Sequence, residues 1–480
     1  MYDLAIIGAG VVGCALAYTL SSFDLSVVLI EKENDVAMGA SRANTAIIHA
    51  GFDPTPESLM GQLSVEGMRR CYQLCEELDV EHRRTGSLVV AFEQSQKSVL
   101  EILYRQGVEN GCQGLELIDG RETRRREPKL SEEIQAALWA PEAGVINPWE
   151  FTLAMAEVAV RNGLTFLPNT EVTALEWKED HYEIQVGSAP PVKAGFVVNA
   201  AGVNSDLIHQ MVAASTFEIV PTRGEYYLLD RTVGPLVQSI IFHSPTTRGK
   251  GVTISPTIHD NFIIGPNSEI IEDRSDTGVT RTGMDHIGEM AIQMLPSLDL
   301  RANIRNYAGV RANSRQGDFY IRMSAEHFLD LAAIKSPGLT CAPSIARLAA
   351  DLLEEAGLPM RKKSLWKGGR RVIRFKEIPE EERQDFIKDN PLYGRVICRC
   401  ESITEGEIVA AMKREIPPVS IDGVKRRAGT GMGRCQGGFC GPRVLEILAR
   451  ETKRHPLTVD EDGTGSFILT AETKGGCAHD

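Results

Sequence analysis

The sequence predicts an α/β fold for most of the chain and a separate small helical module near its C-terminal end. Two observations carry this prediction. An apolar strand, a glycine-rich turn, a helix and a second strand follow one another within the first 31 residues. Four of the ten cysteines fall within the 43 residues from Cys398 to Cys440. At about 100–200 residues per domain, a chain of 480 residues has room for two to four domains.

The composition is that of an ordinary globular protein. Hydrophobic residues make up 42% and charged residues 24%, which excludes disordered, collagen-like, coiled-coil and small disulfide-scaffold classes. The formal net charge is −13. Because broad nucleic-acid binding needs a cationic surface, we expect no nucleic-acid partner.

The N-terminal residues predict no targeting segment. Met1–Leu4 leads directly into a strand, and the longest apolar runs, such as Val27–Ile30 and Val197–Ala201, are far shorter than the ~20 residues that span a bilayer. We therefore expect a cytoplasmic protein without a transmembrane segment, in which clustered cysteines are metal ligands or redox groups. Peripheral membrane association through partners stays open.

The first 31 residues have the pattern of a dinucleotide-binding βαβ unit. The apolar strand Asp3–Ile7 precedes the glycine-rich turn, the helix Cys14–Ser21 follows it, and the strand Leu25–Ile30 ends at Glu31. The glycines permit a tight turn, close approach to a pyrophosphate and helix–strand packing. Glu31 would accept hydrogen bonds from ribose hydroxyls and repel a 2′-phosphate, which disfavours NADP. The three glycines are Gly8, Gly10 and Gly13.

Later segments favour FAD over NAD. The small-residue stretch Gly39–Gly51 replaces the next βα unit that an NAD enzyme would have. Gly195–Ser205 places another apolar strand before a glycine turn, and Ile334–Pro343 precedes the expected helix Ser344–Gly357. Turns of this kind spread over the chain predict a fold that returns repeatedly to one long ligand.

Seven motifs carry a resemblance to a known family: Gly8–Gly13, Ser41–Asn44 with Ile48–Gly51, Gly144–Pro148, Asn199–Gly202, Arg223–Tyr227, Ala308–Arg311 and Lys335–Gly338. Residues 1–360 resemble the FAD-dependent D-amino-acid oxidase/glycerol-3-phosphate dehydrogenase superfamily, and within it L-2-hydroxyglutarate oxidase-like proteins and the large subunit of anaerobic glycerol-3-phosphate dehydrogenase. The resemblance implies a second domain whose antiparallel sheet roofs the flavin. The expected strands of that sheet are Glu183–Val186, Gly224–Leu229, Ile240–Phe242, Val252–Ser255 and Phe262–Ile264.

Four residues are candidates for the chemistry of alcohol oxidation, which needs a base and, for an anionic substrate, a cationic clamp. Arg311 matches the family's substrate-side arginine, although a surface arginine is the alternative. His49 is the candidate base, against a structural histidine. Lys335 would lie at the pyrimidine end of the flavin, or in a solvated loop. Tyr226 would reach the substrate, or face the core.

The resemblance also implies a set of cofactor-binding residues, distributed over the glycine turns and the segments that follow them. Besides the three glycines and Glu31, this set contains Val12, Lys32, Ser41, Arg42, Asn44, Val172, Ala201, Gly202, Gly338, Leu339 and Thr340.

The four clustered cysteines predict a [2Fe–2S] site. Cys398 and Cys400 form C-x-C, and after 34 residues Cys435 and Cys440 form C-x₄-C. Two thiolate pairs cap the two irons of such a cluster, whereas zinc, the main rival, prefers wider spacings than C-x-C. The block resembles the bacterioferritin-associated-ferredoxin-type [2Fe–2S] domain. Around the ligands we expect helices over Ile403–Glu415, with Thr404 as N-cap and Glu407 completing a capping box, and over Pro442–Arg454.

The expected fold class is therefore α/β plus α+β: a Rossmann-like FAD-binding domain, an antiparallel-sheet substrate domain and a small C-terminal helical [2Fe–2S] domain. The eight basic residues of 361–376 predict a solvated linker, with binding to an acidic carrier or lipid headgroups as the alternative. The remaining cysteines are expected to be packing thiols, with a free thiol at Cys477. The expected boundaries are 1–360 for the oxidoreductase (FAD-binding parts about 1–80, 145–215 and 325–360; substrate domain about 81–144 and 216–324), 361–394 for the linker, 395–455 for the cluster domain and 456–480 for a tail.

Together the two modules predict a dehydrogenase, because an oxidase that delivers electrons to oxygen needs no cluster. We expect oxidation of sn-glycerol 3-phosphate or a small 2-hydroxyacid, with electrons leaving through the cluster to an acceptor protein or partner subunit. Two alternatives stay open: an amine or imino-acid dehydrogenase of the same superfamily, and an electron-transfer flavoprotein subunit without its own organic substrate.

Overall fold

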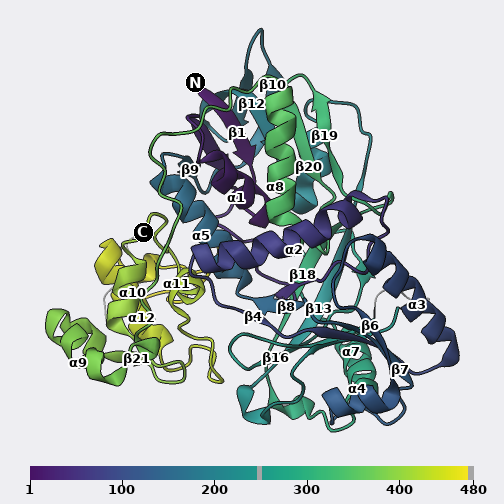
Figure 1. Cartoon of the computed structure of the whole chain (residues 1–480). Coiled ribbons are helices and arrows are strands. Elements are labelled where there is room, and N and C mark those ends of the chain that lie inside the picture. The colour runs from purple at the N-terminus through teal and green to yellow at the C-terminus, as the bar shows by residue number, and fades with distance from the viewer. Residues whose placement is uncertain (246–250, 474–480) are drawn as a thin grey trace.

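The computed structural model describes residues 1–245 and 251–473, which form two large sheets with their helices and a small C-terminal helical domain (Figure 1). Cys477 lies outside the described residues. Among the described residues, no helix is long and apolar enough to cross a membrane.

The first sheet has parallel strands at its centre. β1 pairs in parallel with β12 and β2, β2 with β9, and β12 with β20. The four apolar residues at the end of β1 and all of β2 are buried, as expected for parallel strands that helices cover on both faces. Its strands are β1 (Tyr2–Ile7), β2 (Val27–Ile30), β9 (Thr165–Leu167), β10 (Val172–Trp177), β11 (Tyr182–Val186), β12 (Ala189–Asn199), β19 (Tyr320–Ala325) and β20 (Phe328–Ala332).

Helices enclose this sheet. Figure 1 shows α1 and α8 beside the strands, with α2 running across below them. The helices α1, α2, α5 and α8 contribute many fully buried side chains to one continuous core. The bounds are α1 (Val11–Leu20), α2 (Leu59–Glu77), α5 (Pro148–Arg161), α6 (Ser205–His209) and α8 (Gly338–Glu355).

The second sheet is largely antiparallel, and its strands β13 and β18 pair along almost their whole lengths. Among the described strands of this sheet, only β14 and β5 pair in parallel. The strands are β5 (Ser87–Ala91), β6 (Glu116–Asp119), β7 (Ala136–Ala140), β13 (Ile219–Leu229), β14 (Ile240–His243), β15 (Thr253–Pro256), β16 (Phe262–Gly265), β17 (Glu269–Ile270) and β18 (Asn303–Ser314); α3 (Gln94–Glu109), α4 (Gly120–Arg126) and α7 (Arg281–Met294) accompany them.

A three-stranded sheet of β3 (Ile47–Ile48), β8 (Gly144–Ile146) and β4 (His82–Arg84) lies between the two large sheets in Figure 1. His49 directly follows β3, so this small sheet fixes the start of the segment that contains His49.

Two sequence expectations about elements were wrong. Glu183–Val186 belongs to β11 in the first sheet, where β11 forms antiparallel pairs with β10 and β12. The short alternating pattern of apolar and polar residues in this strand is compatible with either sheet, so the sequence alone could not predict to which sheet the strand belongs. The helix expected from Ser344 begins at Gly338 and includes Pro343. Proline removes one helical hydrogen bond, and the burial of α8 against α1 and α2 overrides that local cost.

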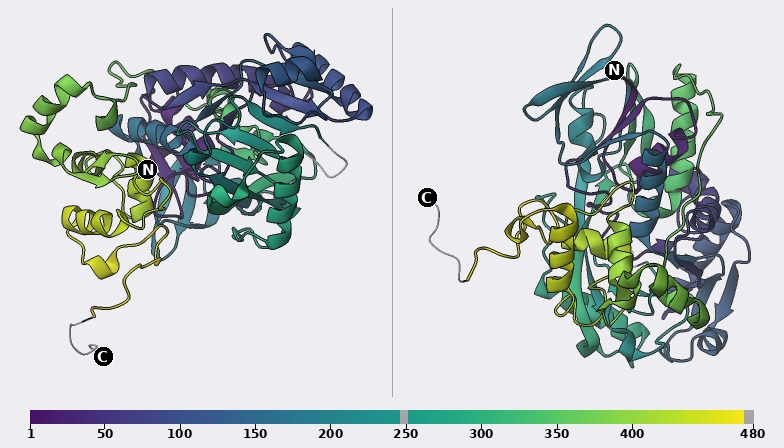
Figure 2. Two further views of the ribbon diagram at one scale, coloured as in Figure 1. Left: turned by 90° about the horizontal axis from the view of Figure 1, so that it is seen from below. Right: turned by 90° about the vertical axis from the view of Figure 1, so that its left-hand side faces the viewer.

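The C-terminal domain has its own apolar core, to which Ile408, Val424, Val444 and Leu448 contribute nearly inaccessible side chains. As expected, α10 begins after the N-cap Thr404, and Glu407 completes the capping box. Figure 2 shows this domain projecting from one side of the larger body. Its elements are β21 (Val396–Cys398), β22 (Ile403–Thr404), α10 (Glu405–Ala411), α11 (Ile421–Ala428) and α12 (Gly441–Thr452); α9 (Glu380–Asp389) precedes them.

The basic segment before this domain is exposed along most of its length, as expected, but two of its arginines are not solvated. Arg370 is buried and pairs with Glu157 at 2.7 Å and with Glu150 at 3.3 Å. Arg374 reaches the same Glu150 at 3.0 Å and Asp79 at 3.2 Å. These ion pairs hold the segment against α2 and α5, and no local sequence signal distinguishes such anchoring arginines from solvated ones.

Candidate active site and cluster site

Two glycine turns meet at the carboxyl ends of β1 and β12. Gly8 has φ +105°, and a Cβ placed on it would lie 2.5 Å from the carbonyl oxygen of Ala200. A Cβ on Gly13 would lie 2.0 Å from the carbonyl oxygen of Gly8. This packing brings the predicted cofactor residues Ala201 and Gly202 beside the first turn. Because glycine has no side chain to block it, a pyrophosphate can approach the backbone at the start of α1. The first N–H groups of this helix lack intrahelical acceptors and can donate to the phosphate oxygens.

The loop after β2 is tied to the same turn. The N–H of Val11 donates to Ser41 Oγ at 2.9 Å, which connects this loop to the first residue of α1. The Asn44 side chain donates to the Ser41 carbonyl at 2.9 Å and accepts from the N–H of Ala46 at 2.8 Å. Ser41 and Asn44 therefore shape the loop next to the turn that contains Gly10 and Val12.

Glu31 lies at the end of β2, as the βαβ pattern predicts. Its carboxylate accepts from the N–H of Ala9 at 2.7 Å and from the N–H of Glu33 at 2.9 Å. Burial raises the pKa of Glu31, and these two backbone hydrogen bonds act against the rise. Lys32 is half exposed beside Glu33, and Val172 is buried at the start of β10.

His49 lies against the first turn of α8. Its backbone N–H donates to Thr340 Oγ1 at 3.0 Å, and its Nε2 lies 3.3 Å from Ser336 Oγ. The imidazole stacks on the ring of Phe242 in β14, with 5.8 Å between centroids. Ser336 directly follows Lys335, so the structure brings both predicted residues to the turn where α8 begins.

The turn before α8 is tightly hydrogen-bonded. The N–H of Lys335 donates to the Ala333 carbonyl at 3.1 Å, and the Lys335 carbonyl accepts from the N–H of Gly338 at 2.6 Å. The predicted cofactor residues Gly338, Leu339 and Thr340 are the first three residues of α8. The sequence suggested that this helix begins at Ser344. It begins six residues earlier, and its N-terminal end therefore lies beside His49.

One face of the β13–β18 pair turns toward the loop of Asn44. Tyr226 and Tyr307 are opposite one another and stack, with ring centroids 4.7 Å apart. The Tyr307 hydroxyl donates to the Asn44 carbonyl at 3.0 Å. Tyr226 is only 3% exposed, so its contacts in this structure are those of a core tyrosine.

Arg311 lies further along the same pair of strands. Its Nη2 donates to the Asn267 carbonyl at 3.1 Å, and a Cβ placed on Gly224 would lie 2.0 Å from that same nitrogen. Gly224 thus leaves the space that the guanidinium occupies. Arg311 is half-buried, and its hydrogen bond to the Asn267 carbonyl uses one of the five N–H donors of the guanidinium, which leaves donors for an anionic ligand.

The four cysteines form two pairs, and each pair joins one cysteine of the C-x-C motif to one cysteine of the C-x₄-C motif. Cys400 Sγ and Cys435 Sγ are 3.8 Å apart. The Cys440 thiol donates to Cys398, which lowers the pKa of Cys398 to about 6 and raises that of Cys440. Among the described residues, no three His, Cys, Asp or Glu side chains form a site for a single metal ion. Two separate sulfur pairs fit a cluster with two irons, each capped by two thiolates.

Glycines bring these sulfurs together. A Cβ on Gly433 would lie 2.3 Å from the Cβ of Cys400, and Gly429 ends α11 with φ +79°. Burial raises the pKa of Cys435, but the N–H of Phe439 and the Cys400 thiol outweigh it and lower that pKa overall. Each sulfur pair therefore contains one cysteine with a lowered pKa, Cys398 or Cys435, and one with a raised pKa, Cys440 or Cys400. The lowered pKa favours the thiolate, the form that binds iron, in one member of each pair.

Buried charges attach the cluster domain to the FAD-binding region. Arg427 forms a bidentate pair with Asp35, both contacts at 2.7 Å, and Arg426 reaches Asp35 at 3.0 Å and Asp462 at 2.7 Å. Asp462 also pairs with Arg42, a predicted cofactor residue. Sequence reasoning missed this network because Asp35 and Arg427 are 392 positions apart. The adjacent arginines on the short amphipathic helix α11 are a local signal that could have indicated a buried ion-pair site.

The predicted tail also begins with packed residues. Val459 is fully buried in the core of the cluster domain, and Asp460 bridges to Ser420 and Phe467. The domain thus extends beyond residue 455, to at least Asp462.

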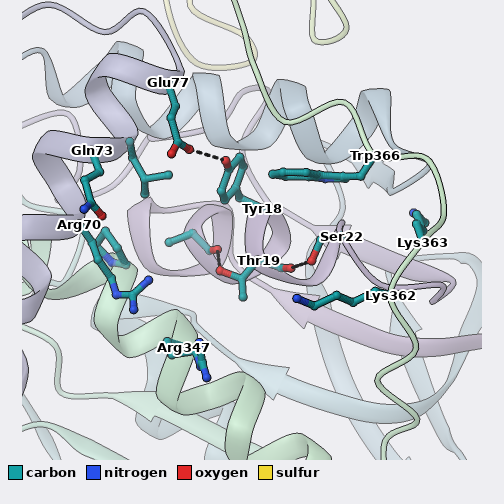
Figure 3. A pocket seen from close by; sticks show the side chains of 13 residues that line it. Tyr18, Thr19, Ser22, Arg70, Gln73, Glu77, Arg347, Lys362, Lys363 and Trp366 are labelled. Carbon is teal, nitrogen blue, oxygen red and sulfur yellow. Dashed lines mark hydrogen bonds between the residues drawn. The ribbon is translucent and has the colours of Figure 1, made fainter.

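A separate cavity of about 420 Å³ lies outside these sites, between α1, α2, α8 and the segment after α8 (Figure 3). Tyr18, Glu77 and Trp366 line it together with several cationic side chains. It contains none of the predicted site residues.

The fold and these two sites define a flavoprotein oxidoreductase with an attached iron–sulfur domain. Residues 3–352 match the family described as FAD dependent oxidoreductase, and residues 396–450 match the BFD-like [2Fe-2S] binding domain. The chain belongs to the FAD-dependent oxidoreductase family and carries a [2Fe–2S] domain of the BFD-like type.

Individual relatives agree with this assignment. The chain is 44% identical to glycerol 3-phosphate dehydrogenase of Caloramator mitchellensis over 99% of both chains. It is 34% identical to L-2-hydroxyglutarate dehydrogenase of Caenorhabditis briggsae, over 56% of this chain and 63% of the relative. The FAD-bound structure of L-alpha-glycerophosphate oxidase from Mycoplasma pneumoniae matches with a TM-score of 0.74 and 30% identity, over 78% of this chain and 99% of that one. These likenesses confirm the predicted superfamily, the dehydrogenase class and both cofactors, FAD and [2Fe–2S].

Proposed function

We propose that this protein oxidises sn-glycerol 3-phosphate. The likeness to a glycerol 3-phosphate dehydrogenase along 99% of both chains carries the proposal, because it includes the substrate-side strands and the cluster domain together. The likeness to L-2-hydroxyglutarate dehydrogenase spans only about half of this chain and makes that hydroxyacid the competitor to test.

Arg311 is the proposed clamp for the substrate phosphate. A guanidinium is permanently charged, and its planar donors match phosphate oxygens in pairs. The position of Arg311, on the strand face that turns toward the Asn44 loop, supports this role. The Asn267 carbonyl holds one guanidinium nitrogen and so orients the others.

His49 is the proposed base. Oxidation of a secondary alcohol removes a hydride from carbon and a proton from oxygen, and bound FAD supplies the hydride acceptor. His49 Nε2 would take the hydroxyl proton, while Ser336 Oγ and the Phe242 ring fix the plane of the imidazole. The Thr340 hydroxyl holds the His49 backbone and so ties the base to α8.

The remaining proposed roles follow from position. Lys335 would place a cation near the flavin at the start of α8. Tyr226, buried and stacked on Tyr307, would shape the roof of the site rather than contact substrate. The four cysteines Cys398, Cys400, Cys435 and Cys440 would hold the cluster. The glycine turns, Glu31, Ser41 and Asn44 would hold the FAD.

A substrate comparison with an Arg311 variant tests the proposal. Anaerobic dye reduction is measured with sn-glycerol 3-phosphate, L-2-hydroxyglutarate and glycine. We expect turnover with the phosphate ester, and a loss of kcat/KM of at least roughly 100-fold in Arg311→Ala, from the loss of two charge-assisted hydrogen bonds of ~1.5–3 kcal/mol each.

The matched control is Arg315→Ala, since Arg315 directly follows β18, is 79% exposed and pairs with Glu218 at 3.3 Å. It should leave kcat/KM unchanged. Faster turnover of the hydroxyacid or of glycine, or equal effects of the two substitutions, would refute the assignment of the substrate.

A further inference from the structure

The cluster domain has the opposite charge to the rest of the chain. Residues 396–450 contain nine Lys or Arg and six Asp or Glu, a net charge of +3, within a chain whose net charge is −13. Several of these cations are used in internal ion pairs, such as those of Arg426 and Arg427 with Asp35. Five of the nine are exposed, and three of these five lie within three residues of a ligand cysteine in the sequence.

Three arginines in this group are exposed. Arg399 stands between the ligands Cys398 and Cys400. Arg434, 72% exposed, directly precedes Cys435, and Arg443, 70% exposed, lies in the first turn of α12. The nearest carboxylates are only loosely paired with them, Asp230 at 3.6 Å from Arg434 and Glu446 at 3.7 Å from Arg443. Asp230 is buried, whereas the Arg443–Glu446 pair is exposed on both sides. An exposed pair of this kind contributes little energy and can exchange for a partner's carboxylate.

An apolar side chain lies between these cations in the sequence. Phe439 is 87% exposed, more than any other large hydrophobic side chain of the described residues. It sits in the loop between Cys435 and Cys440, next to a buried ligand cysteine. An exposed aromatic flanked in the sequence by exposed arginines has the residue types of an interface hot spot rather than of an ordinary surface.

Other parts of the cluster loop contact the larger body of the molecule. The Cys400 carbonyl accepts from Arg231 of the second-sheet domain, and Gln436 accepts from Arg305 at 3.4 Å. These contacts occupy that side of the loop. The contact of Arg434 with Asp230 lies on that side too. The exposed residues Arg399, Phe439 and Arg443, here called the Arg/Phe surface, make none of these contacts and remain open to a partner.

We propose that the Arg/Phe surface docks an acidic electron-acceptor protein that takes one electron at a time. This deepens the proposed function, on which it rests, by assigning the partner. Oxidation of one alcohol releases two electrons and two protons, so two acceptor molecules are each reduced by one electron and two protons pass to solvent. The positive surface attracts an acidic partner electrostatically, and Phe439 supplies the apolar contact once the partner is bound.

Binding of an acidic probe tests the surface without relying on turnover. The probe is an oxidised, acidic plant-type [2Fe–2S] ferredoxin, measured by biolayer interferometry on the holoenzyme, and basic cytochrome c is the opposite-charge comparison. We expect saturable binding of the ferredoxin that weakens as the salt concentration rises, and much weaker binding of cytochrome c.

Variants locate the binding site. Charge reversal at Arg443 (Arg443→Glu) and removal of the ring (Phe439→Ala) should each weaken ferredoxin binding about tenfold, because one removes steering charge and the other the apolar anchor. The control is Arg105→Glu on α3, because Arg105 is 74% exposed and its pair with Glu101 at 3.8 Å matches the Arg443 pair in distance and exposure. The cluster absorbance of each variant is recorded to show that the domain is intact.

The results separate the two proposals. Equal binding by wild type and both surface variants, stronger binding of cytochrome c, or an equal loss in Arg105→Glu would overturn the docking site. If Phe439→Ala loses the cluster, Arg443→Glu alone decides. A failure of the substrate proposal shows instead as absent turnover with sn-glycerol 3-phosphate while ferredoxin binding persists.

Discussion

The substitution Asp35→Asn probes how the cluster domain is attached. Asp35 is 2% exposed and accepts three charge-assisted hydrogen bonds, two from Arg427 and one from Arg426. Asparagine has nearly the same shape but no charge, and it can accept at only one of its two terminal atoms. Arg427 would then be left buried without its counter-ion, and Arg426 would lose one of its two carboxylate partners.

The magnitude follows from that geometry. Breaking a buried pair by removing one partner costs ~3–5 kcal/mol, since an uncompensated charge remains. Arg426 keeps Asp462, and Arg427 keeps the carbonyls of Ile416 and Gly423. We therefore expect the lower end, a loss of about 3 kcal/mol in the free energy of unfolding or detachment of the domain.

The pH dependence gives an independent check. Burial raises the pKa of Asp35, but the charges of Arg427 and then Arg426 outweigh it and hold the pKa below its ordinary value. The resulting stability is fully present above the unfolded pKa, about 3.9, and is lost as pH falls through the lower folded pKa. Wild type should lose this contribution only below about pH 4, and Asp35→Asn should lack it at every pH.

Chemical denaturation, followed by cluster absorbance and flavin fluorescence, measures both effects. The control Asp351→Asn removes a half-exposed partner of Arg347 and should change stability by less than about 0.5 kcal/mol. A loss below 1 kcal/mol in Asp35→Asn, or an unchanged acid transition, would refute the view that this buried network attaches the domain.

Three further predictions concern single positions. Gly13→Ala should abolish FAD binding in fluorescence titration, because its Cβ would lie 2.0 Å from the Gly8 carbonyl oxygen, whereas Gly441→Ala, with open space around it, should bind FAD normally. Cys435→Ser should remove the cluster absorbance and leave the FAD spectrum intact; loss of both would contradict two independent sites. Thr404→Ala removes the capping hydrogen bond of α10 and should lower the stability of the cluster domain by ~1 kcal/mol in denaturant melts, and an unchanged midpoint would argue against the capping role.

Local patterns predicted the parts of the molecule that depend on local chemistry. The glycine spacing identified the turn at α1, because only glycine fits where backbone meets backbone. Thr404 and Glu407 marked the start of α10, since a capping box is a local structure. The C-x-C and C-x₄-C motifs predicted two sulfur pairs, but the actual pairing of Cys398 with Cys440 depends on the fold.

Features that depend on long-range contacts were not predictable in this way. The anchoring role of Arg370 is invisible in a basic run, because its partner Glu157 lies on α5. The assignment of β11 to the first sheet depends on hairpin pairing rather than on its composition. Arg42, expected at the cofactor, pairs with Asp462 more than 400 positions away.

An anaerobic absorbance titration with sn-glycerol 3-phosphate tests the central claim most directly. The flavin bands near the visible maximum and the cluster bands are followed together in the holoenzyme, with L-2-hydroxyglutarate as the comparison. The account predicts that the phosphate ester bleaches the flavin and then reduces the cluster, and that Cys435→Ser keeps the first change and loses the second. No bleaching by the phosphate ester, or cluster reduction without it, would contradict the account.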